Sequence, residues 1–237
     1  MSEHEELVGK QMRRWELSKQ LRQRFLRDEQ QPRSTPCVIT ISRQWGSGGT
    51  NIASLVAQKL GFELYDKEII NQVAERLGAD PRHIEHHDER GPDLVGGIIL
   101  QLLEGKRPTE ATYLRTLVKV MRQIAKQGHA VIVGRGGSYI LPESYRVRIV
   151  APENIRVARI SELHNMNEKA ARRAIIETDR QRTNFVRAHF GCDIDNPLDY
   201  DLVINTEHCS IEHAAQLIIE GFRARQEALG VACKTST

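Results

Sequence analysis

Residues 37–53 read CVITISRQWGSGGTNIA, and this stretch decides how the rest of the chain is interpreted. Its first five residues form a short apolar and β-branched run, which is typical of a buried strand. Residues 52–60 carry apolar side chains at helical spacing, and the glycine-rich segment 43–50 lies between the two runs. The predicted order is therefore strand, glycine-rich loop and helix.

A glycine-rich loop at this place suits a phosphate group. Glycine permits the positive φ angles that let backbone N–H groups converge, and the helix that follows adds its free N–H groups and the positive end of its dipole. The usual P-loop pattern, GxxxxGK[ST], aligns with RQWGSGGT at 43–50. Gly48 and Thr50 fit it, whereas Arg43 replaces the first glycine and Gly49 replaces the lysine. A turn that only reverses the chain is the alternative interpretation.

Composition limits the class of protein. The 237 residues are 40% hydrophobic and 27% charged, as in a soluble globular protein with one α/β domain. A net charge of +3 is too small to indicate a nucleic-acid partner, and we expect none. We also expect no membrane association, because no apolar run approaches the ~20 residues of a membrane span. The cysteines at 37, 192, 209 and 233 form no close pair, which predicts neither a metal cluster nor a disulfide framework and favours the cytoplasm.

An amphipathic helix is predicted before this domain. Residues 5–27 carry apolar side chains along one side, and the linker 30–36 contains two prolines, so residues 1–36 form a separate unit. The apolar stripe either packs on its own domain or pairs with a second subunit to give a homodimer. Binding of this helix to a membrane is disfavoured by five carboxylates in and beside it, those of Glu3, Glu5, Glu6, Glu16 and Asp28.

The remaining chain alternates between strands and helices. Strands are expected at 62–65, 129–133, 146–150 and 199–205, and helices at 69–77, 109–127, 168–178 and 211–222, with one more opened by Pro152. Segment 79–108 is rich in glycine and proline and is predicted to be a mobile insertion; its histidines match no zinc spacing. The alternation predicts an α/β domain over 37–228, with five parallel strands and helices on both faces, followed by a disordered tail at 229–237.

Three sets of polar side chains are candidates for a site. Asp66 ends a strand before a helix, where it either caps the helix or contacts a substrate. Arg135 follows a buried strand, so it either points into the crevice at the carboxyl end of the sheet or forms a structural ion pair. The segment 179–187, DRQRTNFVR, is rich in arginine, which grips phosphate oxygens. Its alternative is a solvated helix face.

Residues 37 to about 222 resemble the cytidylate kinase-like family of P-loop nucleoside monophosphate kinases. The resemblance rests on five motifs in the family's order: ISRQWGSGG at 41–49, LYDKEII at 64–70, VIVGRG at 131–136, DxxRxxF at 179–185 and YDLVINT at 200–206. It implies a P-loop NTPase fold with an acceptor-side insertion at 79–112 and a mobile lid at about 160–190. It also implies Mg²⁺-dependent transfer of a phosphoryl group from ATP to a nucleoside monophosphate, CMP or dCMP.

The resemblance assigns roles residue by residue. The donor ATP would be bound by Gly46, Ser47, Gly48, Gly49 and Thr50, with Thr50 also reaching the metal. The acceptor nucleotide would be bound by Asp66, Arg135, Arg156 and Asp179. The catalytic positive charge would come from Arg43, Arg159, Arg180 and Arg182.

The chain departs from the pattern of true cytidylate kinases in three places. The P-loop lysine is absent, Gly136 replaces an aspartate, and Thr50 stands where relatives often have arginine. Two other functions therefore stay open: a nucleotide-binding regulatory or interaction module without turnover, and a small-molecule kinase on the same fold.

Overall fold

The computed structural model describes residues 37–66, 69, 110–231 and 233. Its elements are β1 (Val38–Arg43), α2 (Gly49–Leu60), β2 (Glu63–Tyr65), α6 (Glu110–Gln127), β3 (Ala130–Val133), α7 (Gly137–Ile140), β4 (Tyr145–Val150), α8 (Glu153–His164), α9 (Glu168–Phe190), the 3₁₀ helix η4 (Pro197–Asp199), β5 (Leu202–Asn205) and α10 (Ile211–Ala228). The predicted N-terminal helix, the helix at 69–77 apart from Ile69, and the insertion up to residue 109 lie outside the described residues.

The five strands form one parallel sheet in the order β2-β3-β1-β4-β5. Strand β1 is central, with Ile39 aligned to Val131 of β3 on one side and to Tyr145 of β4 on the other. The sequence prediction of a five-stranded parallel sheet is confirmed. All four residues of β3 are buried, since helices cover both faces of a sheet of this kind.

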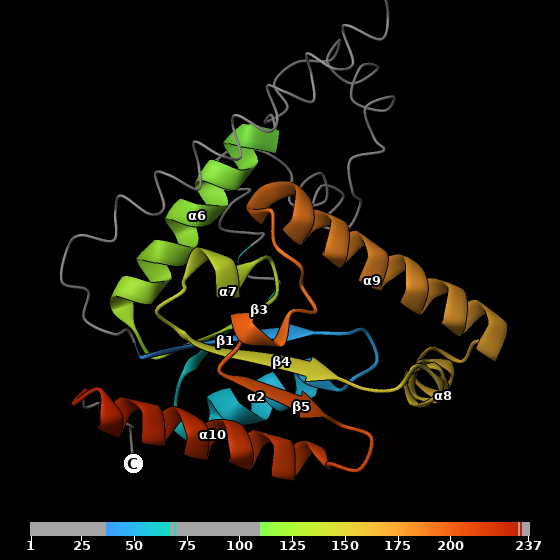
Figure 1. Cartoon of the computed structure of the whole chain (residues 1–237). Helices are drawn as coiled ribbons and strands as arrows, with labels where there is room; N and C mark the ends of the chain where they lie inside the picture. Colours follow the sequence, from blue (N-terminus) through green and yellow to red (C-terminus); the bar gives the residue numbers. More distant parts are fainter. Residues whose placement is uncertain (1–36, 67–68, 70–109, 232, 234–237) are drawn as a thin grey trace, which may run out of the picture.

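Helices cover the sheet from both sides, as predicted (Figure 1). On one face α2 and α10 pack their apolar sides, including Ile52, Val56 and Phe222, against the sheet. On the other face Leu117 and Met121 of α6 pack with α7 and with the carboxyl-terminal part of α9. A smaller cluster of Val157, Ile160, Ala171 and Ile175 holds α8 to α9.

Helix α9 is longer than its predicted 168–178. It begins at the cap Asn167, whose side chain accepts a hydrogen bond from the Ala170 N–H, and it ends at Gly191 with a φ of 66°. The arginine-rich segment 179–187 therefore belongs to one continuous helix. Each candidate arginine then faces either the sheet or the solvent, according to its place on that helix.

The expectation of no disulfide is wrong for one pair. Cys37, directly before β1, is bonded to Cys233, after α10, with their Cα atoms 5.8 Å apart. The two positions are 196 residues apart in the sequence, so only the packing of α10 against the sheet brings them together. Cys233 of the predicted disordered tail is thus held by a covalent bond. Cys192 and Cys209 are not part of a disulfide.

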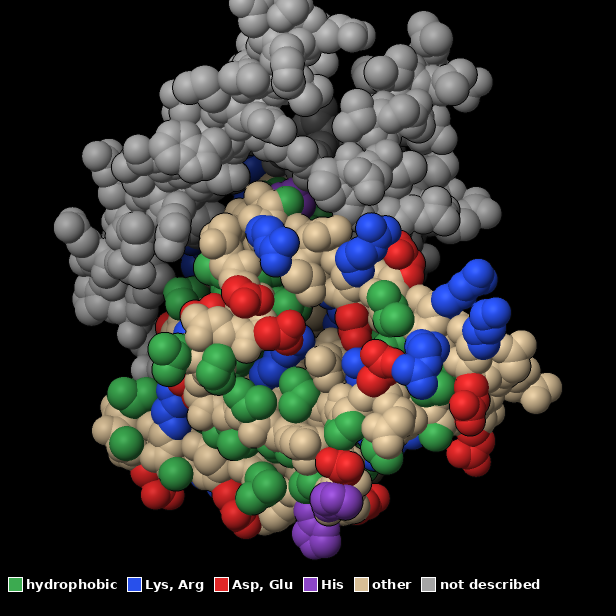
Figure 2. Space-filling model, turned by 45° about the vertical axis from the view of Figure 1, so that its right-hand side comes forward, with side chains coloured by type: hydrophobic (Ala, Val, Ile, Leu, Met, Phe, Trp, Pro, Cys, Tyr) green, Lys and Arg blue, Asp and Glu red, His purple; other side chains and the backbone are tan. Residues whose placement is uncertain are grey.

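The surface carries both signs of charge. On the face that Figure 2 shows, acidic and basic side chains are interspersed over the described part of the molecule. Of the helices described, none has the length and apolar character required to cross a bilayer.

Candidate functional site

The loop after β1 has the backbone that a phosphate-binding loop needs. Gly46 and Gly48 have φ angles of 82° and 81°, which other residues rarely adopt. A Cβ on Gly46 would also lie 3.0 Å from the Arg156 Cβ and its carbonyl oxygen, so this glycine permits a close approach of α8. Helix α2 begins at Gly49 with no side-chain cap, and its first-turn N–H groups have no intrahelical partner. The loop and the helix together form a backbone anion site.

Neighbouring polar groups hold this loop in place. The Ser47 hydroxyl donates to the Gln44 carbonyl at 2.8 Å, and the Gln44 side-chain oxygen accepts from the Ala151 N–H at 3.1 Å. The Thr206 hydroxyl donates to the Ser47 carbonyl at 2.8 Å. Ser47 is fully buried, and its N–H donates to the Gln44 carbonyl at 3.3 Å, so both its hydroxyl and its backbone stabilise the loop.

A cavity of about 750 Å³ opens over the loop. We call it the donor cavity. The described residues that line it are 43–51, Arg159, Ile160, Glu162, Leu163, Arg182, Thr206 and 209–211. The five residues predicted to bind ATP all line it. Thr50 is exposed there, in the first turn of α2. The donor cavity is large enough for a nucleotide, because ligand sites commonly measure about 300–1,000 Å³.

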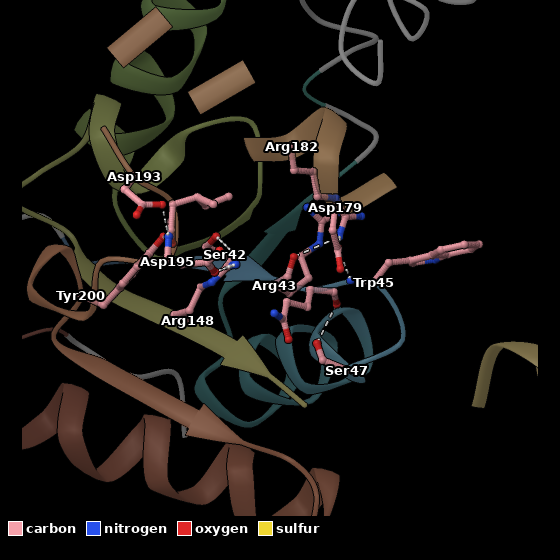
Figure 3. Close-up of polar contacts among 12 residues, drawn as sticks. Ser42, Arg43, Trp45, Ser47, Arg148, Asp179, Arg182, Asp193, Asp195 and Tyr200 are labelled. Carbon is pink, nitrogen blue, oxygen red and sulfur yellow. Dashed lines mark hydrogen bonds and ion pairs between the residues drawn. The ribbon is translucent and has the colours of Figure 1, made fainter. Parts of the chain in front are cut away.

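Arg156 and Asp179 bind the loop instead of lining a cavity. Arg156 is 7% exposed, and its Nη1 donates to the Trp45 carbonyl at 3.1 Å and to the Asp179 carboxylate at 2.5 Å. The other Asp179 oxygen accepts the Trp45 N–H at 2.9 Å (Figure 3). Both residues were predicted to bind the acceptor. The structure places them where they tie the P-loop to α8 and α9.

Arg159 lies at the donor cavity, together with a residue that the sequence did not single out. Its guanidinium donates to the Thr206 hydroxyl at 3.0 Å and to the Thr206 carbonyl at 2.8 Å. Thr206 is 3% exposed and joins the end of β5 to both α8 and the P-loop. A hydroxyl directly after a predicted strand, closing the motif 200–206, was the available signal.

A second, smaller cavity of about 70 Å³ shares Arg43 and Arg182 with the first. We call it the acceptor cavity because Arg135, which was predicted to bind the acceptor, lines it. Its described lining is Ser42, Arg43, Gly134–Tyr139, Thr178, Gln181, Arg182, Phe185, Val186 and Ile194. Arg135 donates to the Asp66 carbonyl at 2.9 Å and lies 3.3 Å from its carboxylate, which is also 3.6 Å from Arg43 Nη2. Arg43 ends β1, and Asp66 and Arg135 come after β2 and β3, so all three lie where the carboxyl ends of neighbouring strands meet at one edge of the sheet. Arg135 thus both forms the ion pair and lines the cavity.

The two lid arginines lie in different places. Arg182 lines both cavities, and its Nη1 donates to the Arg43 carbonyl at 3.0 Å (Figure 3). Arg180 pairs with Glu177 at 3.0 Å on the exposed side of α9 and is not among the residues that line either cavity. The Arg180 guanidinium lowers the pKa of Glu177 from its ordinary value, mainly through hydrogen bonding. Of these two arginines of α9, Arg182 lines both cavities and Arg180 lines neither.

Two residues that line the acceptor cavity, Tyr139 and Ser42, are held by contacts with residues outside its lining. Tyr139 stacks on Phe190 with ring centroids 5.5 Å apart, and burial raises the pKa of its hydroxyl, helped by the hydrogen bond to Tyr200. Arg148 is 5% exposed and donates to Ser42 at 2.8 Å and to Asp195 at 2.6 Å (Figure 3). It ties β1 and β4 to the loop after α9. The sequence did not single it out, although a charge inside an apolar strand was a visible signal.

The described residues fit a magnesium ion that arrives with a nucleotide. They contain no group of three or more His, Cys, Asp or Glu that could enclose a metal. Mg²⁺ keeps several waters and takes other ligands from substrate phosphates, so it needs few protein ligands. The Thr50 hydroxyl, exposed in the donor cavity beside the loop, suits that limited role.

Replacing Gly48 by valine is expected to abolish ATP binding. A Cβ there would have open space, with its nearest neighbour, Ile211 Cγ1, at 3.9 Å, but a β-branched residue resists a φ of 81° and the loop must change shape. Calorimetric titration with ATP measures the loss, and circular dichroism checks folding. Gly230→Val is the matched control, because Gly230 has a φ of 65° and nothing within 4 Å. Unchanged ATP affinity in a folded Gly48→Val protein would contradict the P-loop interpretation.

Comparisons with known proteins agree with this geometry. The model described as "Cytidylate kinase-like family" matches residues 38–208, which run from β1 to just beyond β5. A cytidylate kinase of Staphylothermus marinus is 34% identical over 187 residues, covering 77% of this chain and 94% of that protein. The cytidylate kinase of Methanocaldococcus jannaschii is 24% identical over 187 residues, covering 76% and 94%.

A solved structure supports the fold alone. An uncharacterized protein from Eubacterium ventriosum superposes with a TM-score of 0.61 at 20% sequence identity. The match covers 79% of this chain and 99% of that protein.

Proposed function

Because this chain belongs to the cytidylate kinase-like family, we propose that it transfers the γ-phosphoryl group of ATP, with Mg²⁺, to a nucleoside monophosphate, CMP or dCMP. One observation carries the proposal: Arg43 and Arg182 line both the donor cavity and the acceptor cavity. A phosphoryl group that moves from one cavity to the other would pass these two guanidinium groups. Phosphoryl transfer asks mainly for alignment, exclusion of water and positive charge at that point.

On the donor side, backbone N–H groups of the loop and of the first turn of α2 would hold the phosphates of ATP. Mg²⁺, when bound, would neutralise charge on the phosphate oxygens, with Thr50 as its protein ligand. Arg159, which lines the donor cavity, would stay bound to Thr206 and keep α8 against the loop. Arg156 and Asp179 would keep Trp45, and with it the loop, in position.

On the acceptor side, Arg135 would bind the phosphate of the nucleoside monophosphate. Its present partner is the Asp66 carboxylate, which also lies near Arg43. An incoming phosphate would share these guanidinium groups with Asp66, and Asp66 would keep both arginines aimed at the cavity. Tyr139 and Phe185 offer apolar surface beside this position.

A steady-state assay of the full chain with ATP and a panel of nucleoside monophosphates, beside an ATP-binding titration, tests the proposal. Turnover with CMP or dCMP is the expected result. The specific observation that favours a second candidate is Gly49 in place of the P-loop lysine. If ATP binds and no acceptor is phosphorylated, the chain is a nucleotide-binding regulatory module; turnover only with a non-nucleotide acceptor indicates a small-molecule kinase.

Arg135→Ala is expected to raise the acceptor KM by about 10- to 100-fold and to leave the ATP Kd nearly unchanged. The loss of a charged hydrogen-bond donor costs about 1.5–3 kcal/mol, and Arg135 lines the acceptor cavity but not the donor cavity. Initial rates against acceptor concentration measure the effect. Arg223→Ala, on the exposed side of α10, is the control. A weaker ATP affinity with an unchanged acceptor KM would mean that the two sites are reversed.

Two further expectations are also proposals. We propose that the protein lies in the cytoplasm. Disulfides such as Cys37–Cys233 are rare in that compartment, so cell fractionation is the test. The homodimer through the N-terminal helix is tested by light scattering before and after deletion of residues 1–30, which is expected to shift the protein towards monomer. An unchanged mass would contradict it.

A further inference from the structure

The side chain of Arg43 occupies the space above two glycines. A Cβ added to Gly49 would lie 2.5 Å from the Arg43 Cβ and 3.0 Å from its Cγ, closer than real Cβ atoms approach. A Cβ added to Gly134 would overlap the Arg43 guanidinium, with its carbon Cζ at 3.2 Å. Gly49 therefore leaves the space that the Cβ and Cγ atoms of Arg43 occupy. The Arg43 guanidinium lies over Gly134, whose φ of 75° by itself favours glycine.

The two departures from the P-loop pattern, Arg43 in place of glycine and Gly49 in place of lysine, therefore depend on each other, because the arginine occupies the space of a side chain at position 49. A lysine at position 49 cannot coexist with Arg43 in its present conformation, because the first side-chain atom of the lysine would meet the arginine stem. The stem blocks any side chain at that position of α2. The positive charge at this loop comes from the end of β1, six residues before the usual position of the lysine.

The head of Arg43 lies where the two cavities adjoin. Arg43 lines both of them, its side chain is 16% exposed, and its Nη2 lies 3.6 Å from the Asp66 carboxylate. Its own carbonyl accepts a hydrogen bond from Arg182 at 3.0 Å. The usual P-loop lysine reaches the β- and γ-phosphates from the donor side only. Arg43 instead reaches from the donor loop towards the acceptor.

We propose that Arg43 is the catalytic residue that brings the missing lysine's charge to the transferring phosphoryl group, and that position 49 is glycine because the Arg43 side chain passes it. The inference rests on the proposed phosphoryl transfer. In that step an acceptor phosphate oxygen forms a bond to the γ-phosphorus while the bond to the β-phosphate oxygen breaks, and its electron pair leaves with ADP. Arg43 keeps all its protons and stabilises the negative charge.

The packing part of the inference is tested by stability, which needs no activity. Gly49→Ala is expected to lower the Tm of the parent chain, because the new Cβ meets the Arg43 stem. In an Arg43→Gly background the same change is expected to raise the Tm, because alanine is favoured over glycine in a helix and the other neighbour, Ile149 Cβ, lies at 3.5 Å. If Gly49→Ala shifts the Tm in the same direction in the parent and in the Arg43→Gly protein, the inference that Arg43 requires glycine at position 49 is wrong.

The catalytic part is tested by kinetics of the full chain with ATP and the acceptor that it uses. Arg43→Gly is expected to lower kcat about 100-fold with an ATP Kd within a few-fold of the parent. Arg43→Gly with Gly49→Lys is expected to regain at least about 10-fold, whereas Gly49→Lys alone is expected to lose activity. Arg43→Lys, which keeps a charge on the same stem, is expected to lose less than Arg43→Gly.

The outcomes separate the inference from the proposed function. If the parent turns over and Arg43→Gly keeps a near-normal kcat, or loses ATP affinity and Tm in proportion to kcat, Arg43 is only a structural partner of Asp66 and the inference fails. If Arg43→Lys is as slow as Arg43→Gly, the charge is not what matters and the inference also fails. No turnover in the parent with any acceptor overturns the proposed function, and the catalytic role with it, while the Tm measurements still decide the packing.

Discussion

Replacing Arg182 by alanine is expected to lower kcat about 100-fold or more, a few kcal/mol of activation free energy, and to change the ATP Kd only slightly. Arg182 lines both cavities and donates to the Arg43 carbonyl at 3.0 Å. Its side chain is 24% exposed, so it can turn towards a bound nucleotide without breaking the core. Arg182 is expected to stabilise the negative charge of the transferring phosphoryl group most in the transition state, after the site has closed. Loss of this interaction therefore lowers kcat.

Two other arginines of α9 make this experiment specific. Arg173 is exposed on the same helix and lines neither cavity, so Arg173→Ala removes an equal charge and is expected to leave kcat unchanged. Arg180→Ala is expected to cost much less than Arg182→Ala, because Arg180 pairs with Glu177 away from the cavities. Equal losses for Arg180 and Arg182 would mean that α9 moves before the reaction. A near-normal kcat for Arg182→Ala would exclude a catalytic role for this side chain.

Reduction of the Cys37–Cys233 disulfide is expected to lower the Tm by about 10 °C. The bond joins positions 196 residues apart, and cross-links over long loops remove the most entropy from the unfolded chain, typically stabilising by about 2–5 kcal/mol. For a chain of this size each kcal/mol corresponds to about 2–4 °C. Calorimetry with and without a thiol reductant measures the shift.

Variants show whether that shift belongs to this bond. Cys37→Ser is expected to reproduce the lower Tm and to make it insensitive to reductant, whereas Cys209→Ser, at a free thiol, is expected to keep the parent's response. Thiol titration of the unreduced, denatured chain is expected to find two thiols, those of Cys192 and Cys209. Four reactive thiols would contradict the disulfide.

Local pattern was enough to predict the framework of this protein. The apolar run before 43–50 and the helical spacing after it predicted β1, the loop and α2, because neighbouring residues decide strand and helix periodicity. Alternation of strands and helices predicted the parallel sheet, and Arg135 was placed correctly at its carboxyl edge. The predicted strand and helix boundaries differed from the structure mainly where apolar patterning stops, as along the arginine-rich part of α9.

Contacts between distant segments could not be read from the sequence. Asp179 is 134 residues from Trp45, and Thr206 is 159 residues from Ser47, yet each pair shares a hydrogen bond at the P-loop. The strand order β2-β3-β1-β4-β5 brings them together, and no local periodicity contains that order. The disulfide has the same origin, since Cys37 and Cys233 meet only when α10 packs on the sheet.

The direction of a side chain was likewise decided by tertiary packing. The sequence by itself determined that Arg43 stands where a P-loop has glycine and that Gly49 stands where it has lysine. Only the fold decided that the Arg43 stem fills the space over Gly49 and that its head ends beside Gly134, 91 residues further along the chain. Side chains in a close-packed interior exclude one another, and the pairing of β1 with β3 decides which side chains meet near Arg43.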